Sequence, residues 1–203
     1  MAVNRDRIEY EGIHAYRAQP ETLGAGGVLL LPTIFGLNYV CDYADWLAES
    51  GFATLVWDPY PGEAPITDIH IAAKRASKLQ DDALDAFSRL ADYMLGPMRL
   101  AKIGTLGFCM GGRFNLLFTS HDRRLSACVP IYPSLPEDGR PNQSLDAVAL
   151  AANIARPVQL VYPGRDHVTS YDTFVRLNTA AAPGRNDRTV SCQLSTRIHA
   201  SPR

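Results

Sequence analysis

The chain has 203 residues, a length that suits a single domain over residues 1–203, and its 20 basic and 21 acidic side chains leave a formal net charge of −1. Charges of the two signs are interspersed, which excludes an electrostatic basis for binding nucleic acid or an anionic membrane and favours a small-molecule partner. No apolar run approaches the roughly 20 residues of a membrane helix and the first residues contain no apolar leader, so we expect a soluble, cytoplasmic protein, as a monomer or a small homo-oligomer.

Short apolar strands alternate with helices along the chain. The run GGVLLLP (26–32) is typical of a strand buried on both faces of a parallel sheet, and the helical segment after it has Asn38 as its expected N-cap. Further strands are predicted at 52–60, 102–108, 125–132, 156–164 and 188–195, and helices at 38–51, 68–95 (one or two helices), 110–120, 145–152 and 165–181. This alternation predicts an α/β fold, with a mostly parallel sheet and helices on both faces.

A cysteine stands at the turn between a strand and a helix, in the stretch GFCMGG. Gly107, Cys109 and Gly111 form GxCxG, the cysteine version of the GxSxG nucleophile elbow, in which small residues permit a strained turn. At a helix N-terminus, free N–H groups and the helix dipole are expected to lower the pKa of the thiol. We expect the Met110 N–H to be one donor of an oxyanion hole. The alternative is that Cys109 is a small buried apolar residue.

The three other cysteines, Cys41, Cys128 and Cys192, form no CxxC pair and lie far apart in the sequence. Neither a zinc site nor a disulfide framework is therefore indicated. We interpret all three as packing residues.

Four segments in the same order resemble the dienelactone hydrolase family, which consists of α/β-hydrolases that open an unsaturated butenolide ring with a Cys-His-Asp triad. GFCMGG resembles the elbow of that family, PTIFGLN its oxyanion-strand motif, FATLVWDPYPG the next strand and loop, and YPGRDHVTS the strand end that bears the acid. The likeness covers residues 28–182 and implies an α/β-hydrolase-type fold. The family continues into a final helix, whereas this chain stops at Arg203, so the expected fold lacks that helix.

The resemblance implies the two partners of Cys109. Asp166 is the acid, placed at the carboxyl end of a strand, where ligand crevices form in parallel sheets; an acid at a helix N-terminus is the alternative. His199, after the last predicted strand, is the implied base, which gives the α/β-hydrolase order of nucleophile, acid and histidine. His167 is a weaker candidate, because neighbouring side chains point in different directions.

The second oxyanion donor implied by the resemblance is the N–H of Ile34. Thr33 stands just before it, at the substrate-binding position where family members of the dienelactone type carry a glutamate that switches the cysteine between thiol and thiolate. A hydroxyl cannot accept the thiol proton at neutral pH, so His199 must act as a conventional general base.

Two arginines are candidates for binding the substrate. Arg203 falls where the family has an arginine that holds a substrate carboxylate. Arg75 is a candidate for a second family arginine, together with Lys74 and Lys78, and a solvated helix face is the alternative explanation for each of these three.

The sequence therefore predicts a hydrolase of small ester or lactone substrates that needs neither a metal nor an organic cofactor. Two alternatives stay open. The first is a non-catalytic protein of the same fold that binds a small ligand or a partner. The second is a redox-sensing protein, because exposed thiolates of low pKa are readily oxidised.

Overall fold

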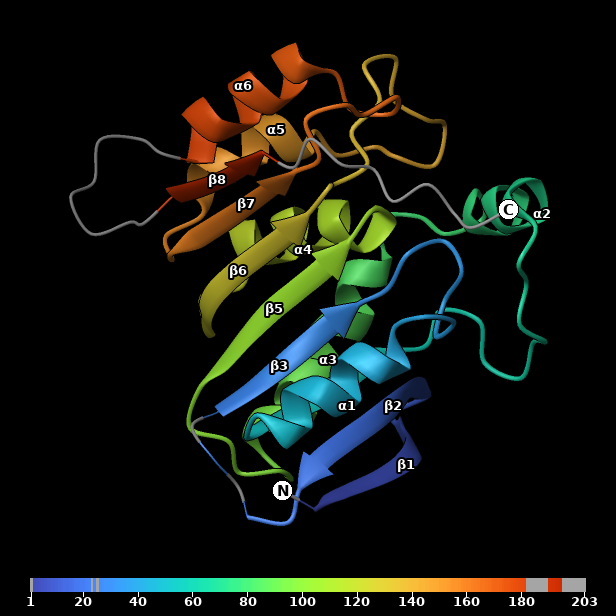
Figure 1. Ribbon diagram of the computed structural model, residues 1–203, viewed down its shortest axis with the longest axis vertical. Helices are drawn as coiled ribbons and strands as arrows, with labels where there is room; N and C mark the ends of the chain where they lie inside the picture. The colour runs from blue at the N-terminus through green and yellow to red at the C-terminus, as the bar shows by residue number, and fades with distance from the viewer. Residues whose placement is uncertain (1, 23, 25, 182–189, 195–203) are drawn as a thin grey trace.

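The structure is a computed structural model that describes residues 2–22, 24, 26–181 and 190–194, and its strands form one twisted sheet (Figure 1). The strands are β1 (Val3–Tyr10), β2 (Ile13–Pro20), β3 (Gly26–Leu31), β4 (Phe52–Trp57), β5 (Ile103–Phe108), β6 (Leu125–Ile131), β7 (Val158–Tyr162) and β8 (Val190–Leu194). Their spatial order is β1-β2-β4-β3-β5-β6-β7-β8. From β4 to β8 along this order, neighbouring strands are parallel, whereas β1 and β2 pair antiparallel. The predicted mostly parallel sheet is confirmed.

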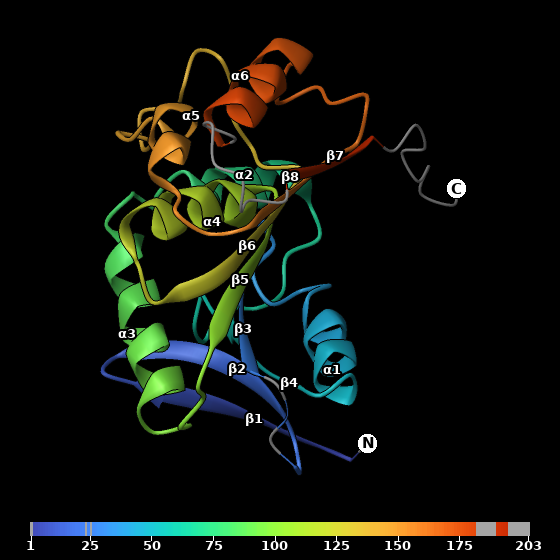
Figure 2. The same ribbon diagram turned by 90° about the vertical axis from the view of Figure 1, so that its left-hand side faces the viewer.

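Helices cover both faces of the sheet, as predicted. They are α1 (Cys41–Glu49), α2 (Ile69–Ala76), α3 (Ala83–Leu95), α4 (Met110–His121), α5 (Ala147–Leu150), the short 3-10 helix η1 (Ala151–Asn153) and α6 (Tyr171–Ala181). Figure 2 shows α1 on one face and α3, α4 and α5 on the other. Among the described residues, no helix has the length and apolar character required to cross a membrane. The residues after β8 lie outside the described part, and so does the expectation about the final helix.

The hydrophobic core has two parts, one on each side of the sheet. The larger cluster lies between the sheet and α3 and α4, with Phe87 and Leu90 of α3 and Leu117 of α4 fully buried. The smaller cluster lies under α1 and includes Leu30 and Ala44. Strand β3 contributes to both clusters, because its apolar side chains alternate between the two faces.

The N-terminal hairpin of β1 and β2 is absent from the sequence prediction. Strand β1 lies at the edge of the sheet, and most of its residues are exposed. Its charges pair across the hairpin, where Arg17 donates to both oxygens of Asp6 at 2.8 and 2.6 Å. The two-residue turn places Glu11 and Gly12 at φ of 50° and 79°, which is typical of a type I′ hairpin. A charged edge strand has no apolar alternation to reveal it.

Two helices begin later than predicted: α1 begins at Cys41 instead of residue 38, and α6 begins at Tyr171 instead of residue 165. Asn38 does not cap α1, because the helix begins at Cys41 and the Asn38 amide instead donates to the Ile66 carbonyl at 3.4 Å. The predicted helical region 68–95 is two helices, and Asp68 caps the first of them by accepting from two backbone N–H groups.

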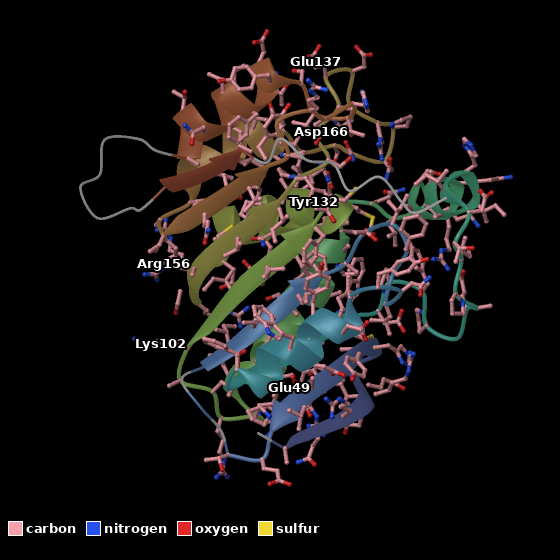
Figure 3. All side chains as sticks on the ribbon, viewed as in Figure 1. Glu49, Lys102, Tyr132, Glu137, Arg156 and Asp166 are labelled. Atoms are coloured by element: carbon pink, nitrogen blue, oxygen red, sulfur yellow. The ribbon has the colours of Figure 1, made fainter. Side chains whose placement is uncertain are left out.

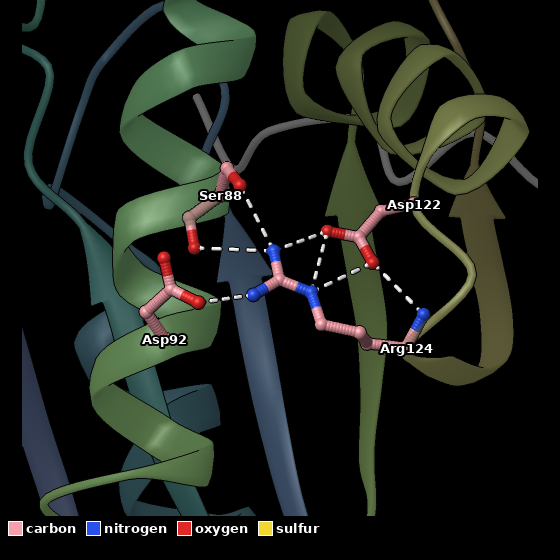
Figure 4. Close-up of polar contacts among 4 residues, drawn as sticks. All are labelled: Ser88, Asp92, Asp122 and Arg124. Atoms are coloured by element: carbon pink, nitrogen blue, oxygen red, sulfur yellow. Dashed lines mark hydrogen bonds and ion pairs between the residues drawn. The ribbon is translucent and has the colours of Figure 1, made fainter.

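An ionic network fixes α3 to the turn after α4. Arg124, in the turn after α4, donates to Asp122 in the same turn and to Ser88 and Asp92 of α3 (Figure 4). Because α4 begins at Met110 and ends at His121, this network lies at the end of the helix away from Cys109.

Candidate active site

Cys109 occupies a strained turn between β5 and α4. Its φ of 53° and ψ of −112° lie in a backbone region that residues other than glycine rarely adopt. Three hydrogen bonds hold the turn: the Cys109 N–H donates to Ile131 O at 3.0 Å, and the Cys109 carbonyl accepts from the N–H groups of Arg113 and Ser134 at 3.1 and 2.9 Å. The surrounding backbone thus stabilises a conformation that the residue itself disfavours.

The glycines beside Cys109 are required by close backbone contacts. A Cβ on Gly107 would lie 2.2 Å from Gly111 O, and one on Gly111 would lie 2.1 Å from Leu31 O. The Gly111 N–H also donates to Pro32 O at 3.0 Å, which joins the start of α4 to the end of β3. The predicted reason for small residues in this motif is confirmed.

The pKa of the Cys109 thiol is higher than the sequence predicted. Burial raises this pKa above its ordinary value, and the lowering by the Met110 N–H and by the charge of Arg140 does not offset it. The negative charge of Asp166 raises the pKa further. The expectation of a lowered thiol pKa was therefore wrong, because desolvation outweighs the helix N-terminus. A thiol whose pKa is raised in this way depends on a neighbouring base to form the thiolate.

The segment after β3 lies beside the start of α4 through the contact of Gly111 with Pro32. Thr33 shapes this segment, since its hydroxyl accepts from the Phe35 N–H at 3.2 Å and its carbonyl accepts from the Gly36 N–H at 3.0 Å. Within the described part of the chain, the Ile34 N–H donates to no protein acceptor. It is therefore available to bind an oxyanion.

Asp166 lies in the loop after β7, close enough for its charge to act on Cys109. One carboxylate oxygen, Oδ1, accepts from the N–H groups of Val168 and Thr169 at 2.7 and 3.1 Å. Thr169 in turn donates to Pro133 O at 2.6 Å and accepts from the Leu135 N–H at 2.9 Å. These bonds tie the loop that carries Asp166 to the loop that hydrogen-bonds Cys109.

The alternative interpretation of Asp166 as a cap of the following helix does not fit. Helix α6 begins at Tyr171, and Ser170 caps it by accepting from the Thr173 N–H at 3.2 Å. His167, next to Asp166, is exposed. The predicted base His199 and the predicted Arg203 lie outside the described residues.

Arg75 does not lie on a solvated helix face. Only 10% of its side chain is exposed, its guanidinium stacks 3.6 Å from the centre of the Tyr60 ring, and it pairs with Glu63 at 3.3 Å. Arg75 lines a cavity of about 270 Å³, together with residues 35–38, which directly follow Ile34 in the sequence. Lys74 and Lys78 are exposed.

The cysteines outside the elbow pack as predicted where the structure describes their side chains. Cys128 is fully buried, its thiol donates to Asn115 Oδ1 at 2.7 Å, and burial raises its pKa to about 12. The Cys41 thiol donates to Leu37 O at 3.4 Å. Cys192 lies in β8, whose side chains are outside the described part.

A buried ion pair beneath the elbow was absent from the sequence prediction. Arg113 of α4 is 4% exposed, and its guanidinium donates to both carboxylate oxygens of Asp81 at 2.5 and 3.0 Å. It also donates to Leu145 O at 2.8 Å, and the Leu145 N–H donates back to Asp81 at 2.8 Å. The sequence signal was a single arginine on a helix that carries no other Lys, Arg, Asp or Glu.

Tyr132 and Arg140 are two further residues near Cys109 that the sequence did not indicate. Tyr132 follows β6 with a φ of 37°, and burial together with the charge of Cys109 raises the pKa of its phenol to about 12. Figure 3 shows Tyr132 and Asp166 near the carboxyl ends of the strands, whereas Lys102 and Arg156 lie toward their amino ends. The described residues contain no group of three or more side chains arranged to hold a metal ion.

A mostly parallel sheet with helices on both faces and a strained cysteine turn between strand and helix defines an α/β-hydrolase-type protein. A model of the dienelactone hydrolase family matches residues 13–192, and the chain belongs to this family.

Curated relatives and solved structures agree with this assignment. A relative from Methylorubrum extorquens is 29% identical over 181 residues, which cover 83% of this chain and 61% of the relative. The carboxymethylenebutenolidase of Rhodococcus opacus is 27% identical over 180 residues, which cover 84% of this chain and 69% of that protein. A crystal structure from Klebsiella pneumoniae superposes with a TM-score of 0.80 at 23% identity, covering 96% of this chain and 85% of that one. The chain spans about three fifths of the length of several curated relatives.

Proposed function

We propose that this chain is a cysteine hydrolase of small ester or lactone substrates. The observation that carries the proposal is the backbone of Cys109, held at a φ of 53° by glycine contacts and three hydrogen bonds at the start of α4. Packing alone gives no reason to maintain such strain, which is typical of a residue that must present its side chain to a substrate. Membership of the dienelactone hydrolase family supports the reaction class.

In the first half of the reaction, Cys109 Sγ attacks the carbonyl carbon of the substrate. His199, oriented by Asp166, takes the thiol proton, a step that is needed because burial raises the pKa of the thiol. The N–H groups of Ile34 and Met110 stabilise the oxyanion of the tetrahedral intermediate. As the intermediate collapses, the C–O bond to the leaving group breaks and the protonated His199 gives its proton to the leaving oxygen.

In the second half, water hydrolyses the thioester. His199 removes a proton from the water, and the resulting hydroxide adds to the same carbonyl carbon. The C–S bond then breaks, and the protonated His199 returns the proton to the Cys109 thiolate. An ester gives an alcohol and an acid. A lactone gives one ring-opened acid, because its leaving oxygen stays attached to the acyl chain.

The thiol environment favours this function over redox sensing. A sensor cysteine needs a thiolate of low pKa, whereas burial raises the pKa of Cys109. A non-catalytic binding protein would have no need for a cysteine held in a strained backbone conformation. Thr33 supports simple esters as substrates beside lactones, because it provides no carboxylate to switch the thiol.

The proposal is tested with two histidine variants. Hydrolysis of an activated aryl ester and of a dienelactone should fall roughly a hundredfold or more in His199→Ala, because the proposed mechanism then lacks its general base. His167→Ala is the matched control, since His167 is exposed and adjacent to Asp166; it should retain the wild-type kcat/KM. Equal losses in both variants, or full activity in His199→Ala, would reject the proposed base.

A further inference from the structure

Three aromatic side chains lie in contact beside the turn that carries Cys109, on the α1 side of the sheet. Phe108, the residue before Cys109, is 7% exposed and belongs to the core cluster under α1. The centre of its ring lies 5.1 Å from that of Tyr43, in the first turn of α1, and 6.0 Å from that of Tyr132, just after β6. Phe108 therefore joins aromatic side chains from two other elements of the fold.

The backbone holds Tyr132 next to Cys109. Phe108 and Ile131 are partners in the pairing of β5 with β6, and the Cys109 N–H donates to Ile131 O at 3.0 Å. Tyr132 is the next residue of the chain, and its own N–H donates to Val161 O at 2.8 Å. Its φ of 37° lies in a region that residues other than glycine rarely adopt. Two neighbouring residues, Cys109 and Tyr132, are thus both held in strained conformations, which is typical of side chains presented to a ligand.

Tyr43 and Tyr132 are open to solvent although both contact the buried ring of Phe108. Their exposed fractions are 51% and 37%. A solvated helix face is usually polar, whereas adjoining exposed apolar side chains are typical of binding surfaces. Each of the two tyrosine rings packs partly on Phe108 and leaves the rest of its surface accessible. The three residues therefore form a continuous aromatic surface at the turn that carries the nucleophile.

We propose that Tyr43, Phe108 and Tyr132 form a subsite for a flat apolar group of the substrate, so that the preferred esters or lactones carry an aromatic ring close to the scissile carbonyl. A substrate ring would cover apolar surface and make offset or edge contacts with the exposed tyrosines. Tyr43 is the specificity-determining residue, because it is the most exposed of the three and comes from α1. This inference rests on the proposed function for its reaction, but binding of the ring does not require turnover.

The test compares alkylation of Cys109 by two neutral reagents, 2-iodo-N-benzylacetamide and 2-iodo-N-ethylacetamide, of which the first carries an aromatic ring. Peptide mass spectrometry separates Cys109 from the other cysteines and gives its rate with each reagent. The ratio of the benzyl rate to the ethyl rate should be roughly three- to tenfold higher for Cys109 than for N-acetylcysteine, as expected for aromatic contacts. Tyr43→Ala should lower this ratio by about threefold or more, because it removes one of the rings. Tyr43→Phe keeps the ring and should keep the ratio.

Trp46→Ala is the matched control. Trp46 is 63% exposed and lies on the same helix, one turn further from its start than Tyr43. Figure 3 shows that α1 runs away from the site, because its last residue, Glu49, lies far from Tyr132. Loss of the Trp46 ring should therefore leave the ratio unchanged.

Three results would overturn the inference: a wild-type ratio no higher than that of N-acetylcysteine, an unchanged ratio in Tyr43→Ala, or an equal fall in Trp46→Ala. Both reagents need the same thiolate, so the ratio depends neither on the pKa of the thiol nor on hydrolysis. A protein that hydrolyses esters but shows no effect of Tyr43 would refute this inference alone. A protein that shows the ring effect but no hydrolysis would support the aromatic subsite and refute the proposed function alone.

Discussion

Replacing Cys109 with alanine should reduce kcat/KM for an activated aryl ester by roughly a thousandfold or more. In the proposed mechanism the Cys109 thiol is the nucleophile, and the oxyanion donors alone give a small fraction of the rate. Activity is measured from the release of the aryl alcohol, corrected for the uncatalysed reaction. The folded state should be retained, because alanine fits where the thiol lies and the turn is held by backbone hydrogen bonds.

Cys41→Ala is the matched control for that experiment. Cys41 is a free cysteine at the start of α1, and its thiol donates to the carbonyl of Leu37, in the turn that precedes this helix. Its replacement should leave kcat/KM within about twofold of the wild type, as for a substitution that removes no catalytic group. Wild-type hydrolysis by Cys109→Ala would remove Cys109 from the mechanism altogether.

Replacing Arg113 with methionine should destabilise the protein by about 3–5 kcal/mol, because it leaves the carboxylate of Asp81 buried without its partner. The free energy of unfolding is measured by urea denaturation at pH 7. The double variant Arg113→Met with Asp81→Leu should recover much of the loss, because it removes both charges. A single variant as stable as the wild type would contradict a stabilising role for this pair.

The ion pair between Asp81 and Arg113 also makes the free energy of unfolding depend on pH. Burial opposes ionisation of Asp81, but the bonds from Arg113, Leu145 and Ser144 outweigh it and hold the pKa of the carboxyl below its ordinary value. Its contribution to stability is therefore fully present at neutral pH and is lost as the pH falls through the lowered pKa of the folded state. The stability difference between wild type and Arg113→Met should shrink in that acidic range.

The sheet and the strained turn at Cys109 could be predicted because both depend on short stretches of sequence. Strand β3 is a continuous apolar run, and the elbow is a short motif whose glycines are needed for backbone contacts at 2.1 and 2.2 Å. The hairpin of β1 and β2 could not be predicted in the same way, because an exposed edge strand is free to carry charges on both faces.

The surroundings of Cys109 depend on contacts between distant segments, which local patterns do not reveal. The helix N-terminus correctly suggested a lowering effect of the Met110 N–H, but the degree of burial, which decides the pKa, is a property of the folded molecule. Arg140 comes from the long loop between β6 and α5, where no sequence pattern indicates a position near Cys109. Arg113 pairs with Asp81, which is 32 residues away in the sequence.

Trapping the covalent intermediate tests the central claim that Cys109 is the nucleophile. The protein is mixed with p-nitrophenyl acetate, quenched with acid at short times, and analysed by mass spectrometry of the intact chain and of its peptides. We predict a species heavier by one acetyl group, with the acetyl on the peptide that contains Cys109, and no such species in Cys109→Ala. Steady release of p-nitrophenol with the acetyl group on another residue, or on none, would contradict the account.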